Sequence, residues 1–524
     1  MGRLKGPSSL AFVIGISALI FSLLPLRTAF EMGDDEGYEV IKGFMCSKGF
    51  KLYTEIWNDQ PPVSTMILRK AFELWGPSIF IARLVAAGFG LVLLAAFHEL
   101  VRKRSGHWTA MLATFFLLAS PGVLILCVSV MLEVPAFATA LVSAWLLFEW
   151  GKRRHWVWLV ASGAVMALAL QIKLTAALIL PAIMIELLFL SWPTVKAKPA
   201  TVNARVTGKK GRKPNIIEPQ SNASSQDDFW KTLLKQITAR MVLWGLSMVL
   251  VFATIGLTWG KGALASSWKS HTSSQVVAGL DRVEDHKFDP RLLRNHFECA
   301  VAAAVCLLAA FQQKRMREVS FPLALLVTAA MIHTVHRPWW NYYYLHLAIP
   351  LAWLAGWAVS EAVKVVFRLQ SKVAFNFTSG ATWKALALCA LAALAITRSE
   401  RRLEPTIKGL RQQPTVDANP IVKKMKAYAG RTNWAYSESG IYPFHAQLRV
   451  PPELAIIMPK RFWSGQITTE EIVETCKRYA PELIVLPKAK PNEEWTSLLQ
   501  GDYDLVAVDT KNLLYVGKRV GKEH

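Results

Sequence analysis

Metal-binding and redox motifs are missing from this sequence of 524 residues. Its six cysteines include no C-x-x-C pair, and four of the six lie in apolar runs. This pattern predicts neither a zinc site nor a disulfide framework. The sequence also lacks a glycine-rich phosphate loop and a recognisable Ser/His/Asp set, which excludes the common nucleotide-binding and hydrolase motifs.

Acidic residues are also scarce, with 37 Asp and Glu against 60 Lys and Arg, and a formal net charge of +23. The basic residues fall in short clusters between apolar runs rather than in one soluble segment. Such clusters indicate membrane topology, and we expect no nucleic-acid partner. With 53% hydrophobic residues and a mean hydropathy of +0.28, the chain is predicted to be a multi-pass membrane protein whose principal environment is the lipid bilayer.

Apolar runs predict about eleven membrane-spanning helices, each near the length that crosses a bilayer. The first run follows Arg3 and Lys5 without a small-residue cleavage site, so it is expected to remain as an uncleaved span that starts in the cytoplasm. The loops assigned to the cytoplasm are basic, which predicts an inside amino terminus and an outside carboxyl terminus. The expected spans are 10–26, 78–101, 108–121, 135–150, 156–172, 174–192, 240–259, 297–312, 319–335, 345–365 and 381–397.

The expected fold class is therefore mainly α, a polytopic helix bundle with a small extracytoplasmic α/β domain. The membrane domain is predicted to cover 1–397 and to include a flexible, polybasic cytoplasmic linker at 193–239. The soluble domain is predicted to cover 398–524, where short β-like runs alternate with amphipathic helix candidates. For this domain a lid, an acceptor-docking role or a structural role is favoured over a second active site.

Four carboxylates crowd the first outer loop directly after the first span, and the same loop contains Tyr53 and ends at 58–62. Acids clustered at the mouth of a membrane bundle favour a pathway or a site, although a solvated loop could also carry them. The four are Glu31, Asp34, Asp35 and Glu36.

Further ionisable residues are predicted at the same outer face. Glu133 stands among apolar residues and needs a cation, a metal or a proton donor, unless it reaches water. Lys173 is a lone outer-face cation, which either binds an anionic substrate or snorkels to the interface. Between the ninth and tenth spans, the run from His336 to His346 supplies hydrogen-bond donors and aromatic rings. Together these groups predict one outer-face site where cations stabilise a departing phosphate and a carboxylate deprotonates an attacking hydroxyl.

The order and spacing of these residues resemble the membrane glycosyltransferases of the GT-C superfamily. The nearest group is the bacterial branch of the protein O-mannosyltransferase family, glycosyltransferase family 39, which includes the lipid A aminoarabinose transferase. The resemblance covers most of residues 10–365. It rests on Asp35-Glu36-Gly-Tyr38, Tyr53, Pro61-Pro62, Ala82-Arg-Leu84, Glu133, Lys173 and Tyr343-Tyr344.

The resemblance implies a catalytic set of Asp35, Glu36 and Glu133, with Asp35 as the expected catalytic base. It also implies that Lys173 contacts the donor phosphate. One departure is that Gln60 precedes Pro61 where the aminoarabinose transferase has Lys, so Arg337 or His336 is a candidate replacement for that contact. The expected substrate-binding residues are Asp34, Tyr53, Arg83, Lys173, His336, Arg337, Tyr343 and Tyr344.

The resemblance implies an inverting glycosyltransferase in the cell inner (plasma) membrane. It would move a sugar from a polyprenyl-phosphate donor to an unknown glycan, lipid or protein acceptor on the outer face. The alternative is a transporter or flippase for a polyprenyl-linked lipid, which would favour charged or broken helices near mid-membrane. No cofactor is required by the sequence. Asp35 and Glu133 could together hold one divalent metal ion, but a single base would equally suffice for inversion.

Overall fold

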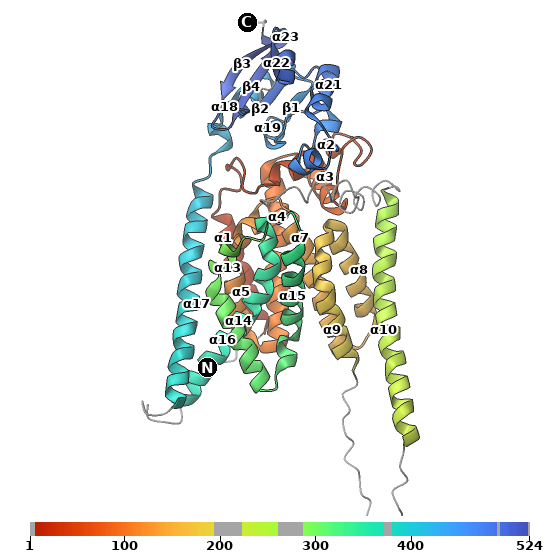
Figure 1. Ribbon diagram of the computed structural model, residues 1–524, viewed down its shortest axis with the longest axis vertical. Helices are drawn as coiled ribbons and strands as arrows, with labels where there is room; N and C mark the ends of the chain where they lie inside the picture. Colours follow the sequence, from red (N-terminus) through yellow and green to blue (C-terminus); the bar gives the residue numbers. More distant parts are fainter. Residues whose placement is uncertain (1–5, 193–222, 260–286, 371–379, 490–492, 522–524) are drawn as a thin grey trace, which may run out of the picture.

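The computed structural model describes residues 6–192, 223–259, 287–370, 380–489 and 493–521. Its long helices run side by side in one bundle, and a small α/β domain lies over one end of them (Figure 1). The amino terminus lies near the opposite end of the bundle, and the carboxyl terminus lies in the small domain. The chain is therefore mainly helical, as predicted.

The bundle and its first outer loop contain most of the helices. Two helices of the first loop, α2 (Glu36–Ser47) and α3 (Val63–Trp75), lie between the bundle and the small domain. The remaining elements are α1 (Gly6–Ser22), α4 (Ile79–Ser105), α5 (His107–Leu118), α6 (Val123–Val128), α7 (Glu133–Arg153), α8 (Trp156–Ile172), η1 (Leu174–Ile179), α9 (Leu180–Ser191), α10 (Ala223–Thr258), α13 (Pro290–Arg294), α14 (Phe297–Gln312), α15 (Met316–Val335), η2 (Asn341–Tyr344), α16 (Leu345–Gln370) and α17 (Gly380–Arg411).

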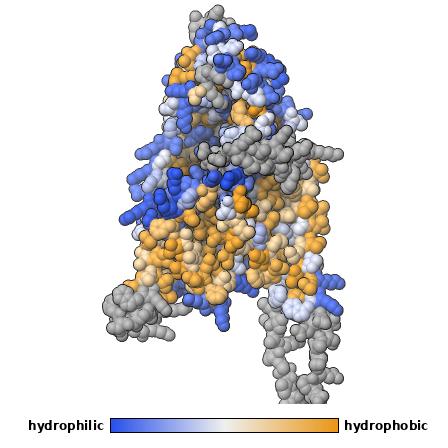
Figure 2. Space-filling model, viewed as in Figure 1, coloured by the Kyte–Doolittle hydropathy of each residue, from blue (hydrophilic) through white to orange (hydrophobic). Residues whose placement is uncertain are grey.

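The bundle is built to lie in a membrane. Among the described residues, six helical segments are long and apolar enough to cross one, and four shorter apolar helices accompany them. Figure 2 shows a broad hydrophobic band over the bundle and a mostly hydrophilic surface over the small domain. Leu246, Val249 and Leu250 of α10 are each more than half exposed, which suits contact with lipid. The chain is a multi-pass membrane protein, and each run predicted as a span coincides with a helix.

Two predicted boundaries differ from the observed helices. The linker predicted at 193–239 is helical from Ala223, where α10 begins, and the rest of that linker lies outside the described residues. Charged residues at 227–239 hid the helical spacing of Phe229, Leu233 and Ile237. The boundary predicted at 398 falls inside α17, which continues as a helix to Arg411 although its last turns are charged.

The small domain contains a four-stranded mixed sheet in the order β1-β2-β4-β3. β1 (Ala435–Ser437) pairs in parallel with β2 (Leu483–Pro487), whereas β4 (Asn512–Gly517) is antiparallel to both β2 and β3 (Tyr503–Val508). The strands lie in the segment for which short β-like runs are predicted, and those runs, 434–437, 482–486, 505–508 and 513–516, each overlap one strand. The helices of the domain are α18 (Pro420–Tyr428), α19 (Ile441–His445), α20 (Pro459–Trp463), α21 (Thr469–Tyr479), α22 (Glu493–Leu499) and α23 (Lys518–Gly521).

The first outer loop and the small domain share one hydrophobic core. Val40, Ile41 and Phe44 of α2 belong to the same cluster of buried residues as Ile441 and Phe444 of α19. Phe444 lies edge-on to Phe44, with ring centroids 5.9 Å apart. The loop that carries the predicted catalytic acids therefore folds against the carboxyl-terminal part of the chain.

Gly440 lies at the closest contact between the two parts. A Cβ at this position would lie 2.6 Å from Cγ2 of Ile41 and 2.7 Å from the carbonyl oxygen of Gly37. Both distances are far below van der Waals contact, and a backbone oxygen cannot move away as a flexible side chain can.

We predict that Gly440→Val destabilises the docked first loop, because overpacking of a close contact typically costs about 1–3 kcal/mol. Thermal unfolding and limited proteolysis within residues 31–77 measure the effect. Gly430→Ala is the matched control, since nothing lies within 4 Å of the added Cβ there. Equal melting temperatures and equal cleavage of the two variants would contradict this account of the contact.

Candidate active site

Asp35 stands at the amino terminus of α2, yet its side chain makes no capping hydrogen bond. An aspartate at this position ordinarily bonds the first backbone amides of the helix. Here the hydroxyl of Tyr342 hydrogen-bonds the carboxyl group, and the charges of Lys173 and Glu133 act on it. The carboxyl group is therefore directed at other side chains and remains available for chemistry.

Burial raises the pKa of the Asp35 carboxyl to about 7, with Glu133 and Glu39 adding to the shift and Lys173 opposing it. A general base works best when its pKa is near the working pH. Asp35 combines this tuning with partial exposure, so a substrate can reach it.

Glu133 and Lys173 form a buried ion pair next to Asp35. Glu133 opens α7, where the helix dipole favours a carboxylate. Lys173 stands in an extended conformation at the end of α8. Because α7 and α8 pack against each other and are joined by a short turn, the start of one lies beside the end of the other. One oxygen of Glu133, Oε2, has no hydrogen-bond partner.

Lys173 also faces two tyrosine rings of the segment between α15 and α16. Its Nζ lies 4.9 Å from the ring centroid of Tyr342 and 5.4 Å from that of Tyr343. Aromatic faces stabilise a cation at this range. Four segments far apart in sequence thus bring two acids, a cation and two tyrosines into one cluster, which consists of Asp35, Glu133, Lys173, Tyr342 and Tyr343.

Glu36 and Arg83 make a second, fully buried pair just behind this cluster. The Arg83 guanidinium donates to both carboxylate oxygens, at 3.0 and 2.7 Å. Glu36 also accepts bonds from two backbone amides, and Arg83 donates to two backbone carbonyls. With neither side chain exposed, this pair is suited to positioning the first loop on α4. The catalytic role predicted for Glu36 and the substrate-binding role predicted for Arg83 stay predictions.

Other predicted residues lie at the margin of the cluster or outside it. Asp34 and Arg337 are exposed, and the ring of His336 is tilted against Tyr343 with centroids 6.1 Å apart. Tyr53 donates its hydroxyl to the carbonyl of Gln60 and so closes the first loop. Tyr344 is buried and bonds Nδ1 of His296 at 3.0 Å, in a separate group of side chains.

The sequence analysis missed Tyr342 and Glu39. Tyr342 is the tyrosine that contacts Asp35, whereas the neighbouring Tyr344 does not join the cluster. Glu39 is buried, pairs with Lys42 at 2.7 Å, and acts on Asp35 electrostatically. A spacing of four residues from Asp35, which puts both on one helix face, is the signal that could have identified Glu39.

A group of buried side chains that could hold a metal ion lies elsewhere. Among the described residues, His296, Glu298 and Cys299 present ligand atoms within 4.8 Å of one another. Arg402 forms an ion pair with Glu298, and both ring nitrogens of His296 have hydrogen-bond partners. A metal ion would have to displace these contacts. At the predicted Asp35–Glu133 position, Lys173 already supplies a positive charge to both carboxylates.

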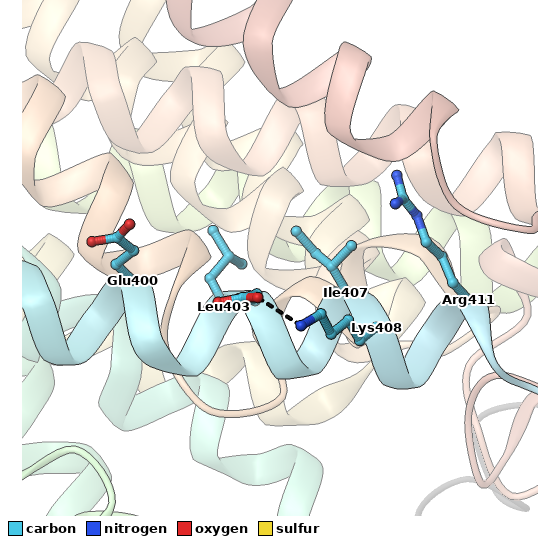
Figure 3. A pocket seen from close by; sticks show the side chains of 6 residues that line it. Glu400, Leu403, Ile407, Lys408 and Arg411 are labelled. Carbon is cyan, nitrogen blue, oxygen red and sulfur yellow. Dashed lines mark ion pairs between the residues drawn. The ribbon is translucent and has the colours of Figure 1, made fainter.

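A shallow pocket follows one side of α17 (Figure 3). Leu403 and Ile407 form its apolar part, while Lys408 pairs with Glu404 at 2.7 Å. Arg411 donates to the carbonyl of Leu23 beyond the end of α1. None of the residues that line this pocket belongs to the acid cluster, so it is a surface feature of the helix that leads into the small domain.

The positioning role of the Glu36–Arg83 pair can be tested by measuring how much the pair contributes to the stability of the folded protein. Arg83→Met should destabilise the protein by about 3–5 kcal/mol, because it leaves a buried carboxylate without its cation. The double variant Glu36→Gln with Arg83→Met should recover much of that loss. Denaturant unfolding in detergent measures both. A double variant no more stable than Arg83→Met would contradict the paired role.

Comparison with known proteins supports the resemblance inferred from the sequence. Residues 59–206 match the family described as "Dolichyl-phosphate-mannose-protein mannosyltransferase". This segment includes Arg83, Glu133 and Lys173. A search of curated proteins finds no match to this chain.

Solved structures extend the likeness to nearly the whole chain. ArnT from Cupriavidus metallidurans bound to undecaprenyl phosphate aligns over 98% of both chains, with 14% identity and a TM-score of 0.56. The apo state of the same protein aligns over 96% of this chain and 97% of that one, with 13% identity and a TM-score of 0.57. The oligosaccharyltransferase AglB from Archaeoglobus fulgidus aligns over 93% of this chain and 70% of its own, with 12% identity and a TM-score of 0.54.

At these identities the solved structures establish the fold, which is that of ArnT, and the family match covers the segment that contains Glu133 and Lys173. These findings agree with the resemblance inferred from the sequence: residues 59–206 match the mannosyltransferase family model, and the fold is similar to those of ArnT and AglB over most of the chain.

Proposed function

We propose that this chain is an inverting glycosyltransferase that moves a sugar from a polyprenyl-phosphate donor to a hydroxyl acceptor at the outer face of the membrane. The observation that carries the proposal is the uncapped carboxyl group of Asp35 beside the buried Lys173–Glu133 pair. The solved relatives support the donor class, since ArnT is described with undecaprenyl phosphate and AglB with a dolichol-phosphate.

In the proposed reaction Asp35 accepts the proton of the acceptor hydroxyl. The hydroxyl oxygen forms a bond to the anomeric carbon as the bond from that carbon to the phosphate oxygen breaks. The polyprenyl phosphate leaves with the electron pair, and Lys173 stabilises its charge. Attack from the side opposite the phosphate inverts the anomeric centre.

Glu133 keeps Lys173 charged and aimed at the site, while Tyr342 fixes the Asp35 carboxyl group by its hydroxyl. A lipid phosphate holds the donor in the bilayer, so the reacting groups must lie at the ends of the helices. Asp35, Glu133 and Lys173 all lie at helix ends that face the small domain. This geometry is consistent with a site on the same face as the small domain. From the basic loops and apolar runs we further propose that this face is extracytoplasmic, with an inside amino terminus, about eleven spans and residence in the plasma membrane.

Asp35→Asn is expected to lower transfer about 10²–10⁴-fold without loss of folding, because the amide has the same shape but cannot accept the proton. A panel of radiolabelled polyprenyl-phosphate sugars with purified protein measures transfer and sugar release. Parallel reactions with a chelator test whether a divalent metal takes part. Turnover by Asp35→Asn at the wild-type rate would remove Asp35 from the mechanism.

The same assignment predicts a pH dependence. Asp35 must be deprotonated to act, and its pKa is raised to about 7, so kcat/KM should rise about tenfold per pH unit below 7 and level off above it. Glu31 is the matched control: burial raises its pKa to about 7 as well, yet Glu31→Gln should keep the profile. If kcat/KM of Glu31→Gln no longer fell below pH 7, that fall in the wild type would be caused by protonation of Glu31 and not of Asp35.

Lys173 is expected to bind the donor phosphate. The single change would leave Glu133 buried without a cation, so the double variant Lys173→Met with Glu133→Gln is the informative one. It should fold and insert normally but raise the KM for the donor at least about tenfold. Lys51→Ala, which removes an exposed cation from the first loop, is the control. If the double variant had the same KM for the donor as the wild type, Lys173 would have a structural role and would not bind the donor phosphate.

A further inference from the structure

The three consecutive tyrosines of η2 point in three directions. In a 3₁₀ helix one turn takes three residues, so neighbouring side chains lie about 120° apart around the axis. Tyr342 hydrogen-bonds the Asp35 carboxyl group. The ring of Tyr343 stacks on those of His333 and His346, with centroids 5.7 and 5.6 Å away. Because the turn is rigid, the direction of any one tyrosine sets the directions of the other two.

Tyr344 points away from Asp35, toward a buried histidine. Its hydroxyl lies 3.0 Å from Nδ1 of His296, and Nε2 of that ring lies 3.2 Å from Oγ of Ser120. Ser120 donates its only hydroxyl proton to the carbonyl of Phe116 at 2.7 Å. Its oxygen must therefore accept a bond from Nε2–H of His296. Since a neutral imidazole has one N–H and one acceptor nitrogen, Nδ1 accepts the bond that the Tyr344 hydroxyl donates.

One arginine of α17 fastens both segments that carry this group. Arg402 donates to the carbonyl of Ala119, the residue before Ser120, at 3.1 Å. It also forms an ion pair with Glu298, which stands two residues after His296 and is fully buried. The residues that follow α5 and the start of α14 are thereby held together. His296 thus has a fixed position beside η2.

We propose that His296 is a positioning residue, which acts through Tyr344 and the turn of η2 to hold the Tyr342 hydroxyl on the Asp35 carboxyl group. This inference rests on the proposed function, in which Asp35 is the base. Without the bond to His296, η2 is free to turn about its axis, and such a turn moves the Tyr342 hydroxyl off the carboxyl group.

Loss of the bond between Tyr342 and Asp35 has a measurable consequence. A hydroxyl that donates to a carboxyl group stabilises its charged form, so this bond lowers the pKa of Asp35. Without the bond the pKa rises, and the fall of kcat/KM toward low pH begins at a higher pH. The other charged groups that act on Asp35 are Lys173, Glu133 and Glu39. They stand outside η2 and are held by their own ion pairs.

The test compares the pH dependence of kcat/KM for sugar release by the full-length protein, with the radiolabelled donor from which it releases most sugar. The variants are Tyr344→Phe, which removes only the hydroxyl bound by His296, Tyr342→Phe, and both changes together. Tyr503→Phe is the matched control, because it removes a hydroxyl that donates to the carbonyl of Pro481 at 2.8 Å in the small domain.

Tyr344→Phe should move the midpoint of the fall in kcat/KM upward by about half a pH unit, and Tyr342→Phe should move it at least as far. The double variant should move it no further than Tyr342→Phe alone, because both changes remove the same bond to Asp35. Tyr503→Phe should equal the wild type. His296→Leu should reproduce Tyr344→Phe, and if His296→Leu does not fold, the tyrosine variants decide the question.

Two results would overturn the inference. One is a midpoint that does not move in Tyr344→Phe, even if the rate falls equally at every pH, since a hydroxyl that only stabilises the fold would give that result. The other is a double variant in which the two shifts add, because Tyr344 would then act on Asp35 without Tyr342. Failure of the proposed function looks different, because the wild type would then release no sugar from any polyprenyl-phosphate donor.

Discussion

The buried pair of Glu36 and Arg83 is the contact on which the candidate site depends. Two charges removed from water are costly unless both are fully hydrogen-bonded. Here the guanidinium and the carboxylate satisfy each other and four backbone groups. The pair thereby fixes the start of α2 against α4. Since Asp35 directly precedes Glu36, the position of the proposed base is set by a neighbour that is fully buried in an ion pair.

A second constraint is electrostatic. Asp35, Glu39 and Glu133 are three neighbouring acids, and Lys42 and Lys173 pair with Glu39 and Glu133 respectively. Asp35 feels the charge of Lys173 but forms no ion pair with it among the described contacts. Burial, with the charges of Glu133 and Glu39 adding to it, therefore raises the pKa of Asp35 to about 7. Because Glu39 and Glu133 are held in ion pairs, Asp35 is the acid of the three that is left for the proposed proton transfer.

The sequence predicted the helical membrane domain well because long apolar runs dictate helices in lipid. The strands of the small domain were also located, because each is a short β-like run between helix candidates. The convergence of Asp35, Glu133 and Lys173 followed from loop sidedness alone. Which of three consecutive tyrosines faces Asp35 did not, because it depends on the turn of η2 rather than on residue type.

The contact between the first loop and α20 was equally out of reach, because nothing in the pattern of Asp59 or Lys460 indicates a contact across 401 positions. The buried pairing of Glu36 with Arg83 was out of reach for a related reason. A charged side chain looks the same in sequence whether it faces a substrate or a buried partner. Only packing distinguishes the two.

The core shared by α2 and α19 has a consequence for the order of events during synthesis. The first loop leaves the ribosome early, yet the residues that complete its core are made much later. Until then its apolar side chains have no permanent partner. In the proposed topology the first loop should therefore reach its final structure only when the small domain has crossed the membrane, and a nascent or truncated chain should be inert toward the proposed lipid-linked donor.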